Sequence, residues 1–393
     1  MTTTTTREAT STSGQVLHVA VELGARKWLV GSSPGWGQRP RERPVAGGDG
    51  PALLEEIARA KQRFGLPAAA RVVCCYEAGP DGFWLYRFLR AHGVECVVVD
   101  SSSIEVNRQK RRAKTDTLDV RALVRLLIRW QLGEEKVWRV VHVPDATAED
   151  RRQWHRETAA LTEERTRIRN RVRGLLKSQG IDLRPGTPWK KLDAVLAREQ
   201  LWDGSPIGRQ LLERLGRELE RMALLDEQLR TVRRAMLQEL KTVGETAGPV
   251  AMMQRLVELR GIGVQISRVL VMELFAWRDF TNRRQVGGCV GFNAPPYQSG
   301  DTSREQGISK AGNVWVRRVL GQLAWSWVRL QPQSELTQWF TKRFAHGGRR
   351  QRARGIIALA RKLLIALWRY VHGGAAPAGA VFGQDAIYEL KAA

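Results

Sequence analysis

The sequence predicts two structural classes in one chain, an α/β domain followed by mainly helical domains. Short apolar runs with strand character alternate with helical patterns as far as about residue 143. Apolar residues then recur at heptad spacing, and helical patterns dominate the rest of the chain. We therefore expect an α/β plus all-α architecture. The first block has the element order β-β-(β)-α-β-α-β-α, which is typical of a mixed sheet covered by helices.

Composition restricts the classes of function. The 393 residues carry 64 Lys and Arg against 40 Asp and Glu, a formal charge of +24 that attracts polyanions. The four cysteines lack CxxC spacing, which fits a reducing compartment and argues against a zinc module. No apolar run reaches the roughly 18 residues of a membrane span. We expect a cytoplasmic protein without membrane contact. The Thr/Ser-rich residues 1–14 are expected to be a disordered tail.

The α/β domain is expected over residues 15–143. Its helices are predicted from apolar spacing, and Gly93 is the expected left-handed residue after the second of them. Residues 34–50, rich in Gly, Pro and Arg, are interpreted as a loop or a weak strand. Strands are expected at Val16–Leu23, Trp28–Ser32, Ala70–Tyr76 and Val94–Val99, and helices at Pro51–Phe64 and Asp81–His92.

Four acids in this basic domain suggest a metal site. Asp116 and Asp119 are three residues apart at the start of an apolar helix pattern, so they share one helix face. Glu22 and Glu77 end two strand-like runs. Carboxylates that gather repel by roughly 4 kcal/mol per pair at 4 Å and an effective dielectric of 20, so they need a cation, protons or nearby arginines. Mg²⁺ prefers such ligands. The alternative is that Thr115 or Asp116 caps the helix and Glu22 is a surface charge.

Residues 144–245 are predicted to form a coiled-coil helical hairpin. Heptad positions recur from Trp154 to Leu175 and again from Leu215 to Val243, separated by a Pro/Gly-rich stretch. The arginines of the first arm, Arg167 and Arg171 among them, are either a solvated face or a nucleic-acid contact. The second seam is predicted to mediate oligomerisation.

A second helical domain is expected over residues 246–373, followed by a tail over 374–393. The run Leu259–Gly263 is typical of a helix-hairpin-helix turn, although a simple tight turn explains it equally well. Ser299 precedes a glycine in a polar, loop-rich stretch and is either a turn residue or a nucleophile; Ser309 is a possible helix cap. No acid occurs from Leu336 to Gln384, which predicts a phosphate-binding surface.

Taken in order, several motifs resemble one family. They are Val19–Glu22, Tyr76–Pro80, Arg112–Asp119, Leu259–Gly263, Gln298–Gly300, Ile308–Asn313 and Arg361–Leu363. Together they are similar to those of the DEDD-type insertion-sequence transposases, whose members include the bridge-RNA-guided serine recombinases. The resemblance covers nearly the whole chain and implies a bacterial, nucleoid-associated protein. It departs at Glu22, where the family usually has Asp, so the carboxylate at this position reaches one methylene further.

The resemblance implies a RuvC-like, ribonuclease-H-type first domain with Glu22, Glu77, Asp116 and Asp119 as Mg²⁺ ligands. It implies a transposase domain with Ser299 as the nucleophile, a non-coding bridge RNA, target and donor DNA as partners, and a homo-oligomer between dimer and tetramer. The residues expected to contact nucleic acid are Arg111, Arg112, Lys114, Arg167, Arg171, Gly261, Gly263, Lys310, Arg317, Arg318, Arg361 and Lys362.

The resemblance, together with the basic composition and the four acids, implies an RNA-guided DNA recombinase that cuts and rejoins strands through Ser299, assisted by a carboxylate–Mg²⁺ site. One alternative is a metal-dependent nuclease or Holliday-junction resolvase that uses water. The other is a catalytically inactive nucleic-acid-binding protein.

Overall fold

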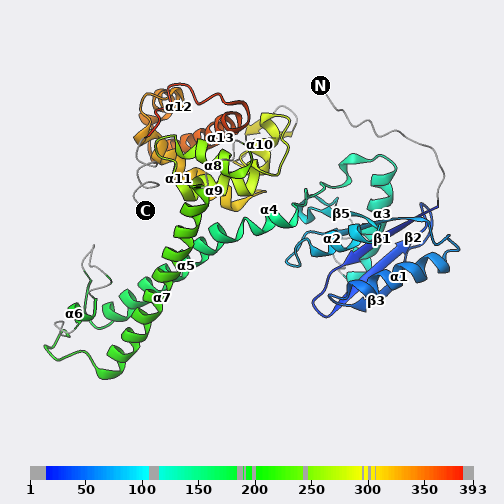
Figure 1. Cartoon of the computed structure of the whole chain (residues 1–393), viewed down its shortest axis with the longest axis horizontal. Helices are drawn as coiled ribbons and strands as arrows, with labels where there is room; N and C mark the ends of the chain where they lie inside the picture. The colour runs from blue at the N-terminus through cyan, green and yellow to red at the C-terminus, as the bar shows by residue number, and fades with distance from the viewer. Residues whose placement is uncertain are drawn as a thin grey trace. The chain divides into compact units, whose positions relative to one another are not determined.

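The structure is a computed structural model, and it describes residues 15–105, 115–183, 189, 192–196, 201–241, 247–293, 296–299, 302–305 and 307–383. The chain divides into two compact units, residues 1–143 and 144–393 (Figure 1). The first holds a sheet with helices on it, and the second is mainly helical. The helical unit contains both the predicted hairpin and the predicted second helical domain.

The sheet of the first unit has five strands in the order β3-β2-β1-β4-β5. Pairs β1–β2 and β2–β3 are antiparallel, whereas β1–β4 and β4–β5 are parallel. The segment interpreted as a loop or weak strand forms β3, an exposed edge strand in which Pro44 is tolerated because an edge leaves N–H groups unpaired. The strands are β1 (Val16–Glu22), β2 (Lys27–Ser33), β3 (Arg41–Ala46), β4 (Arg71–Glu77) and β5 (Glu95–Val99).

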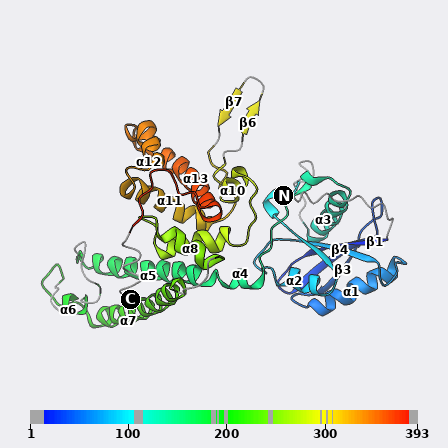
Figure 2. The same ribbon diagram turned by 45° about the horizontal axis from the view of Figure 1, so that its top comes forward.

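Alternating side chains give this sheet two buried faces. Leu17, Val19 and Val21 pack with α1 (Gly50–Arg63) and α2 (Trp84–Ala91) on one face. Ala20 and Cys75 pack with α3 (Asp116–Gln131) on the other. Figure 2 shows α1 and α3 on opposite sides of the strands. The unit is therefore a three-layer α/β domain, as the alternation of elements predicts; η1 (Ser101–Ser103) and η3 (Glu135–Val137) are short 3₁₀ turns.

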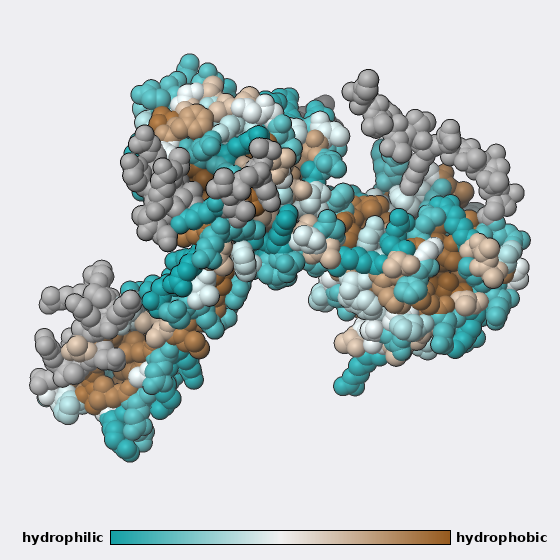
Figure 3. Space-filling model, viewed as in Figure 1, coloured by the Kyte–Doolittle hydropathy of each residue, from teal (hydrophilic) through white to brown (hydrophobic). Residues whose placement is uncertain are grey.

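A long helical hairpin opens the second unit. Arg165 bonds Asp226 and Arg171 bonds Glu218, so residue numbers rise on one helix as they fall on the other and the arms are antiparallel. Apolar side chains from both arms form one core, and in Figure 3 brown apolar residues lie along the hairpin between teal hydrophilic ones. The helices are α4 (Ala146–Asp150), α5 (Gln153–Lys177), α6 (Leu192–Leu196) and α7 (Arg209–Leu240).

The predicted oligomerisation seam is filled within the chain. Met222 and Leu229 are 4% and 1% exposed because they pack against α5. These side chains are therefore not available to a second copy, and the prediction that this seam joins copies is wrong. Heptad spacing identifies a partner helix but does not say whether the partner belongs to the same chain.

The remaining helices pack around a separate apolar core. A two-stranded antiparallel ribbon, β6–β7, interrupts them and projects beside α10 in Figure 2. This ribbon lies where the sequence predicted only loop. None of the helices in the described ranges is long and apolar enough to span a membrane. The elements are α8 (Pro249–Val257), α9 (Val264–Leu270), the π-helical turn η5 (Val271–Phe275), α10 (Arg283–Cys289), β6 (Pro296–Ser299), β7 (Thr302–Glu305), α11 (Val314–Leu330), α12 (Glu335–Phe340), the π-helical turn η6 (Thr341–Ala345) and α13 (Arg349–Gly373).

Candidate active site and nucleic-acid interface

Glu22 and Glu77 end neighbouring parallel strands. Val21 pairs with Tyr76, so the next residue on each strand is one of the two glutamates. Side chains alternate along a strand, which puts Glu22 on the same face as Ala20 and Glu77 on the same face as Cys75. Ala20 and Cys75 pack with α3, so both glutamates lie on the face of the sheet that α3 covers. The sheet register therefore brings the two carboxylates to the same edge and the same side of the sheet.

The two aspartates belong to the first turn of α3. Thr115 is the N-cap, and its Oγ1 accepts a hydrogen bond from the Leu118 N–H at 3.3 Å. Asp116 is exposed and Asp119 is half-buried. The alternative in which Thr115 caps the helix is therefore confirmed, and Asp116 is not the cap.

The helix stripe that continues from these aspartates lies on the sheet. A Cβ added at Gly31 would come within 3.0–3.1 Å of the Val124 and Val120 methyl groups, so the missing side chain lets α3 approach closely. Asp116 and Asp119 extend this stripe by one turn, since positions three and four apart share a helix face. The elements that carry all four acids thus pack together in one domain.

A carboxylate donor set of this kind fits Mg²⁺. Among the residues that the structure describes, however, no three His, Cys, Asp or Glu side chains are grouped closely enough to hold a metal ion. The backbone positions of the four acids agree with the predicted metal site, but no three of their side chains are grouped closely enough to form it. The predicted contacts Arg111, Arg112 and Lys114 precede α3 and lie outside the described residues.

Ser299 is the last residue of β6 and pairs with Thr302, so only residues 300 and 301 separate the two strands. It therefore lies at the end of the ribbon farthest from Pro296 and Glu305, the first and last paired residues (Figure 2). The role of Ser299 as nucleophile stays a prediction from the sequence.

The base of the ribbon is closed by backbone contacts. The Ser309 N–H donates to the Asn293 carbonyl at 3.0 Å, and the Lys310 N–H donates to the Gly291 carbonyl at 3.2 Å. Gly291 has φ +72°, and a Cβ there would collide with the backbone of Ala311. Ser309 is not the helix cap considered from sequence, because Asn313 caps α11. The chain entering the ribbon is thus held against the chain leaving it.

Several predicted nucleic-acid contacts have partners within the protein. Arg171 bonds the buried Glu218 at 2.8 Å, and Arg317 donates to the Val290 carbonyl at 2.9 Å. Arg167 pairs with Glu163 on an exposed helix face, where an ion pair is weak and easily exchanged. Arg171 and Arg317 therefore have structural roles in this fold, and Arg167 is the better candidate for contact.

The other predicted contacts lie at turns and on aromatic rings. Gly261, with φ +94°, makes the turn between α8 and α9, and Gly263 is the N-cap of α9. Lys310 is exposed and has a left-handed φ of 57°. The Lys362 Nζ lies 4.7 Å from the centre of the Trp339 ring, and Arg318 lies over Trp315. The half-buried Arg361 approaches Gly287, with its Nε 3.0 Å from where a Cβ would be.

An exposed cationic surface surrounds the start of α13. No acid occurs in this part of the sequence, and the arginines at the start of α13 are followed by the buried stripe that anchors the helix. Such a surface suits phosphate oxygens. Its exposed members are Lys342, Arg343, Arg349, Arg350, Arg352 and Arg354.

Comparison with known proteins identifies the family. A model described as Transposase matches residues 51–180, and one described as Transposase IS116/IS110/IS902 family matches residues 253–338. A Sinorhizobium fredii protein named as a transposase, y4rJ, is 41% identical over 382 residues, covering 93% of this chain and 94% of the relative. This chain belongs to the DEDD-type IS110 family of transposases. A second protein from that organism, y4qE, is 29% identical over 65% of this chain and 58% of its own. The transposase for element IS1328 of Yersinia enterocolitica is 30% identical over 47% of this chain and 52% of its own.

Membership supports DNA transposition, and hence DNA cleavage and strand transfer, as the activity of this transposase. The first matched segment includes Glu77, Asp116 and Asp119 but begins after Glu22. The second includes Ser299 and Asn313. Both predicted halves of the chemistry thus lie largely in segments that define the family.

One buried charged residue of this transposase escaped the sequence analysis. Glu273 is fully buried and accepts hydrogen bonds from His155, Arg156 and Asn313. Burial by itself would raise the pKa of Glu273, but the hydrogen bonds and charges of these donors outweigh it and lower the pKa to about 2. Burial also lowers the pKa of His155, so a neutral imidazole donates to a carboxylate. The sequence did contain a sign of this buried charge, because Glu273 is a single acid inside the apolar run 269–275.

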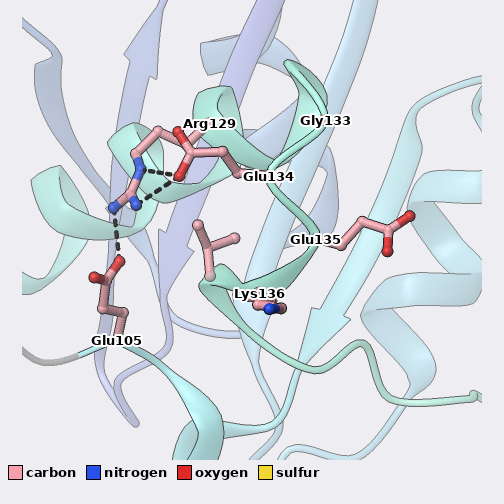
Figure 4. A pocket seen from close by; sticks show the side chains of 7 residues that line it. Glu105, Arg129, Gly133, Glu134, Glu135 and Lys136 are labelled. Atoms are coloured by element: carbon pink, nitrogen blue, oxygen red, sulfur yellow. Dashed lines mark hydrogen bonds and ion pairs between the residues drawn. The ribbon is translucent and has the colours of Figure 1, made fainter.

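A surface pocket of about 460 Å³ in the first unit is a poor candidate for a phosphate site. Arg129 bonds both Glu105 and Glu134 there, and Glu135 and Lys136 complete the charged lining (Figure 4). The single arginine is already neutralised by two carboxylates, so the pocket would repel a polyanion.

Proposed function

We propose that this transposase is an RNA-guided DNA recombinase in which Ser299 attacks DNA and a carboxylate–Mg²⁺ site assists. The proposed metal site is supported chiefly by the strand register, which sets Glu22 beside Glu77 on the face covered by α3. The serine half is supported by the place of Ser299 at the far end of a projecting ribbon, because a nucleophile must reach a phosphate on a bulky duplex.

In the proposed reaction the Ser299 Oγ attacks phosphorus and the P–O bond to one DNA strand breaks. The hydroxyl proton of the serine ends on the departing DNA oxygen, and a phosphoserine bond conserves the energy of the broken ester. A hydroxyl of the partner strand then attacks the same phosphorus, and the proton returns to Ser299. Glu22, Glu77, Asp116 and Asp119 would hold Mg²⁺, which when bound supplies charge stabilisation to phosphoryl oxygens.

The cationic surface at the start of α13 supports binding of nucleic acid backbones. Its charge is independent of base identity, so it supplies affinity but little sequence preference. We propose that a structured RNA from the element, paired with target and donor DNA, provides that preference. The protein would act as an oligomer of two to four copies through surfaces other than the α5–α7 core. Sequencing of RNA that co-purifies with the protein tests this: one discrete species is expected, and random cellular fragments would contradict it.

The serine mechanism is tested by trapping a protein–DNA adduct. Ser299→Ala should abolish both the adduct and strand transfer, while Ser303→Ala on the neighbouring strand β7 serves as the matched control and should retain both. A Ser299→Ala protein that still cleaves would favour the alternative in which water attacks at the metal site. Asp119→Asn should then abolish cleavage, with Glu135→Gln, an exposed acid of the same unit, as its control.

A further inference from the structure

The buried Glu273 joins two parts of the second unit that are far apart in sequence. Its Oε1 accepts from His155 Nε2 and Arg156 Nε, both at 2.8 Å, and these donors belong to α5. Its Oε2 accepts from Arg156 Nη2 at 3.1 Å and from Asn313 Nδ2 at 2.8 Å. A buried carboxylate without such donors would cost several kcal/mol, so the four hydrogen bonds hold these elements together.

Asn313 is bonded on every side. Its Oδ1 accepts from the Val316 N–H at 3.0 Å and so caps α11, while its Nδ2 donates to Glu273. Its own backbone N–H donates to the Cys289 carbonyl at 2.9 Å. The residue therefore links the buried carboxylate to the end of α10, from which the chain continues toward the ribbon.

The bonds of Ser309 and Lys310 then connect Asn313 to the ribbon. They are backbone hydrogen bonds to Asn293 and Gly291, on the segment that enters β6. A Cβ at Gly312 would collide with the Cys289 backbone, so the two segments are in close contact at both ends of the base. A two-stranded ribbon is only marginally stable alone, which makes its direction depend on this base.

We propose that Glu273 is a positioning residue for strand transfer: through Asn313 it fixes the base of the Ser299 ribbon to helix α5. The inference rests on the proposed role of Ser299. Glu273 is fully buried, so its role would be exerted through its hydrogen-bond partners and not by contact with DNA. A shift of α5 would loosen the donors His155 and Arg156, and the ribbon base would lose its anchor.

Asn313→Asp tests the link because it keeps one function of the side chain and removes the other. Asp is as good an N-cap as Asn, so α11 stays capped. The lost Nδ2 donor is replaced by a carboxylate that faces Glu273 and repels it. The matched control is Asn282→Asp, which changes the exposed cap of α10 in the same way with no buried carboxylate opposite.

We expect Asn313→Asp to speed amide hydrogen exchange at Ser309, Lys310 and Asn313 at least tenfold and to lower the strand-transfer rate by a similar factor. DNA affinity should stay within twofold, and Asn282→Asp should leave all three quantities unchanged. The double variant Glu273→Gln with Asn313→Asp restores a donor opposite an acceptor and should recover part of both losses.

Equal exchange and equal strand transfer in Asn313→Asp and the Asn282→Asp control would overturn the proposal. If Asn313→Asp does not fold, the double variant decides: protected amides at 309–313 support the link, and an unfolded double variant overturns it. Exchange is measured without DNA, so it does not depend on the chemistry of Ser299. Full activity in Ser299→Ala would refute the proposed function and leave the exchange result standing.

Discussion

The acids of the first unit and the serine of the second are held in different ways. Glu22 and Glu77 end adjacent strands in the middle of a five-stranded sheet, so the hydrogen bonds of the sheet itself fix their backbones. Ser299 ends a two-stranded ribbon whose base is fixed by helices distant in sequence. The proposed metal ligands therefore depend only on their own domain, whereas the proposed nucleophile depends on contacts from helices elsewhere in the second unit.

The largest effect is expected from the sheet side. Glu77→Gln keeps the size of the side chain and removes the charge that a metal requires, so strand transfer should fall at least a thousandfold, or about 4 kcal/mol. The melting temperature should change little because the strand pairing is intact. A quantitative strand-transfer assay across Mg²⁺ concentrations checks this. Retention of normal activity would remove Glu77 from the site.

A substitution that disrupts the α5–α7 core tests whether the Ser299 ribbon depends on α5. Met222→Asp places an unpaired charge among apolar side chains and should cost about 3–4 kcal/mol in unfolding free energy. Because α5 carries His155 and Arg156, strand transfer should fall with it, while residues 15–143 keep their fold. Urea titration followed by circular dichroism, with the exposed Leu224→Asp as control, measures the cost. Loss of oligomers with unchanged stability would instead restore the intermolecular seam.

Acid should weaken the ribbon support. The pKa of Glu273 is about 2 in the fold against 4.5 for an unperturbed glutamate, so its contribution is fully present above pH 4.5 and is lost as the pH falls toward 2. That contribution is about 3 kcal/mol. Unfolding of the wild type and of Glu273→Gln, compared from pH 7 to pH 2.5, should give curves that converge at the acid end. A constant difference would mean that the charge of Glu273 is not what stabilises the unit.

The smallest effect separates two arginines of α5. Arg171→Ala leaves the buried Glu218 with Arg221 as its remaining ion-pair partner and should cost about 1–2 kcal/mol. Arg167→Ala removes an exposed pair worth under about 0.5 kcal/mol. Nucleic-acid affinity should respond in the opposite order, with the larger loss at Arg167. Thermal unfolding and a filter-binding assay on both variants measure the two rankings.

The sequence was sufficient for elements whose partners are adjacent or periodic. Apolar runs and their order predicted the strands of the sheet core, and heptads predicted both arms of the hairpin. The sequence did not distinguish a loop from a weak strand at β3, because an exposed edge strand lacks the apolar pattern that identifies a buried one. The ribbon was missed because its four-residue strands are polar and are held by contacts at their base.

Spacing along the chain also could not reveal the site in full. Asp116 and Asp119 are recognisable from their i, i+3 spacing. Glu22 and Glu77 are 55 residues apart in sequence, and they become neighbours only through the register between β1 and β4. Glu273 was overlooked because an acid in an apolar run has meaning only when its donors are known, and these come from residues 155, 156 and 313. Pairing of buried charge is a property of tertiary structure.

The close backbone contacts of Gly291 and Gly312 fix the base of the ribbon, so the strands beyond the base can act as a spacer of adjustable length. Residues added in equal number to β6 and β7 would leave these contacts unchanged and carry the tip outward by about 3.3 Å per added pair. Because strand faces alternate, one added pair would also turn the terminal serine to the opposite face, and two would restore it about 7 Å farther out. Reach in this protein is therefore available to evolution or to an engineer only in discrete steps.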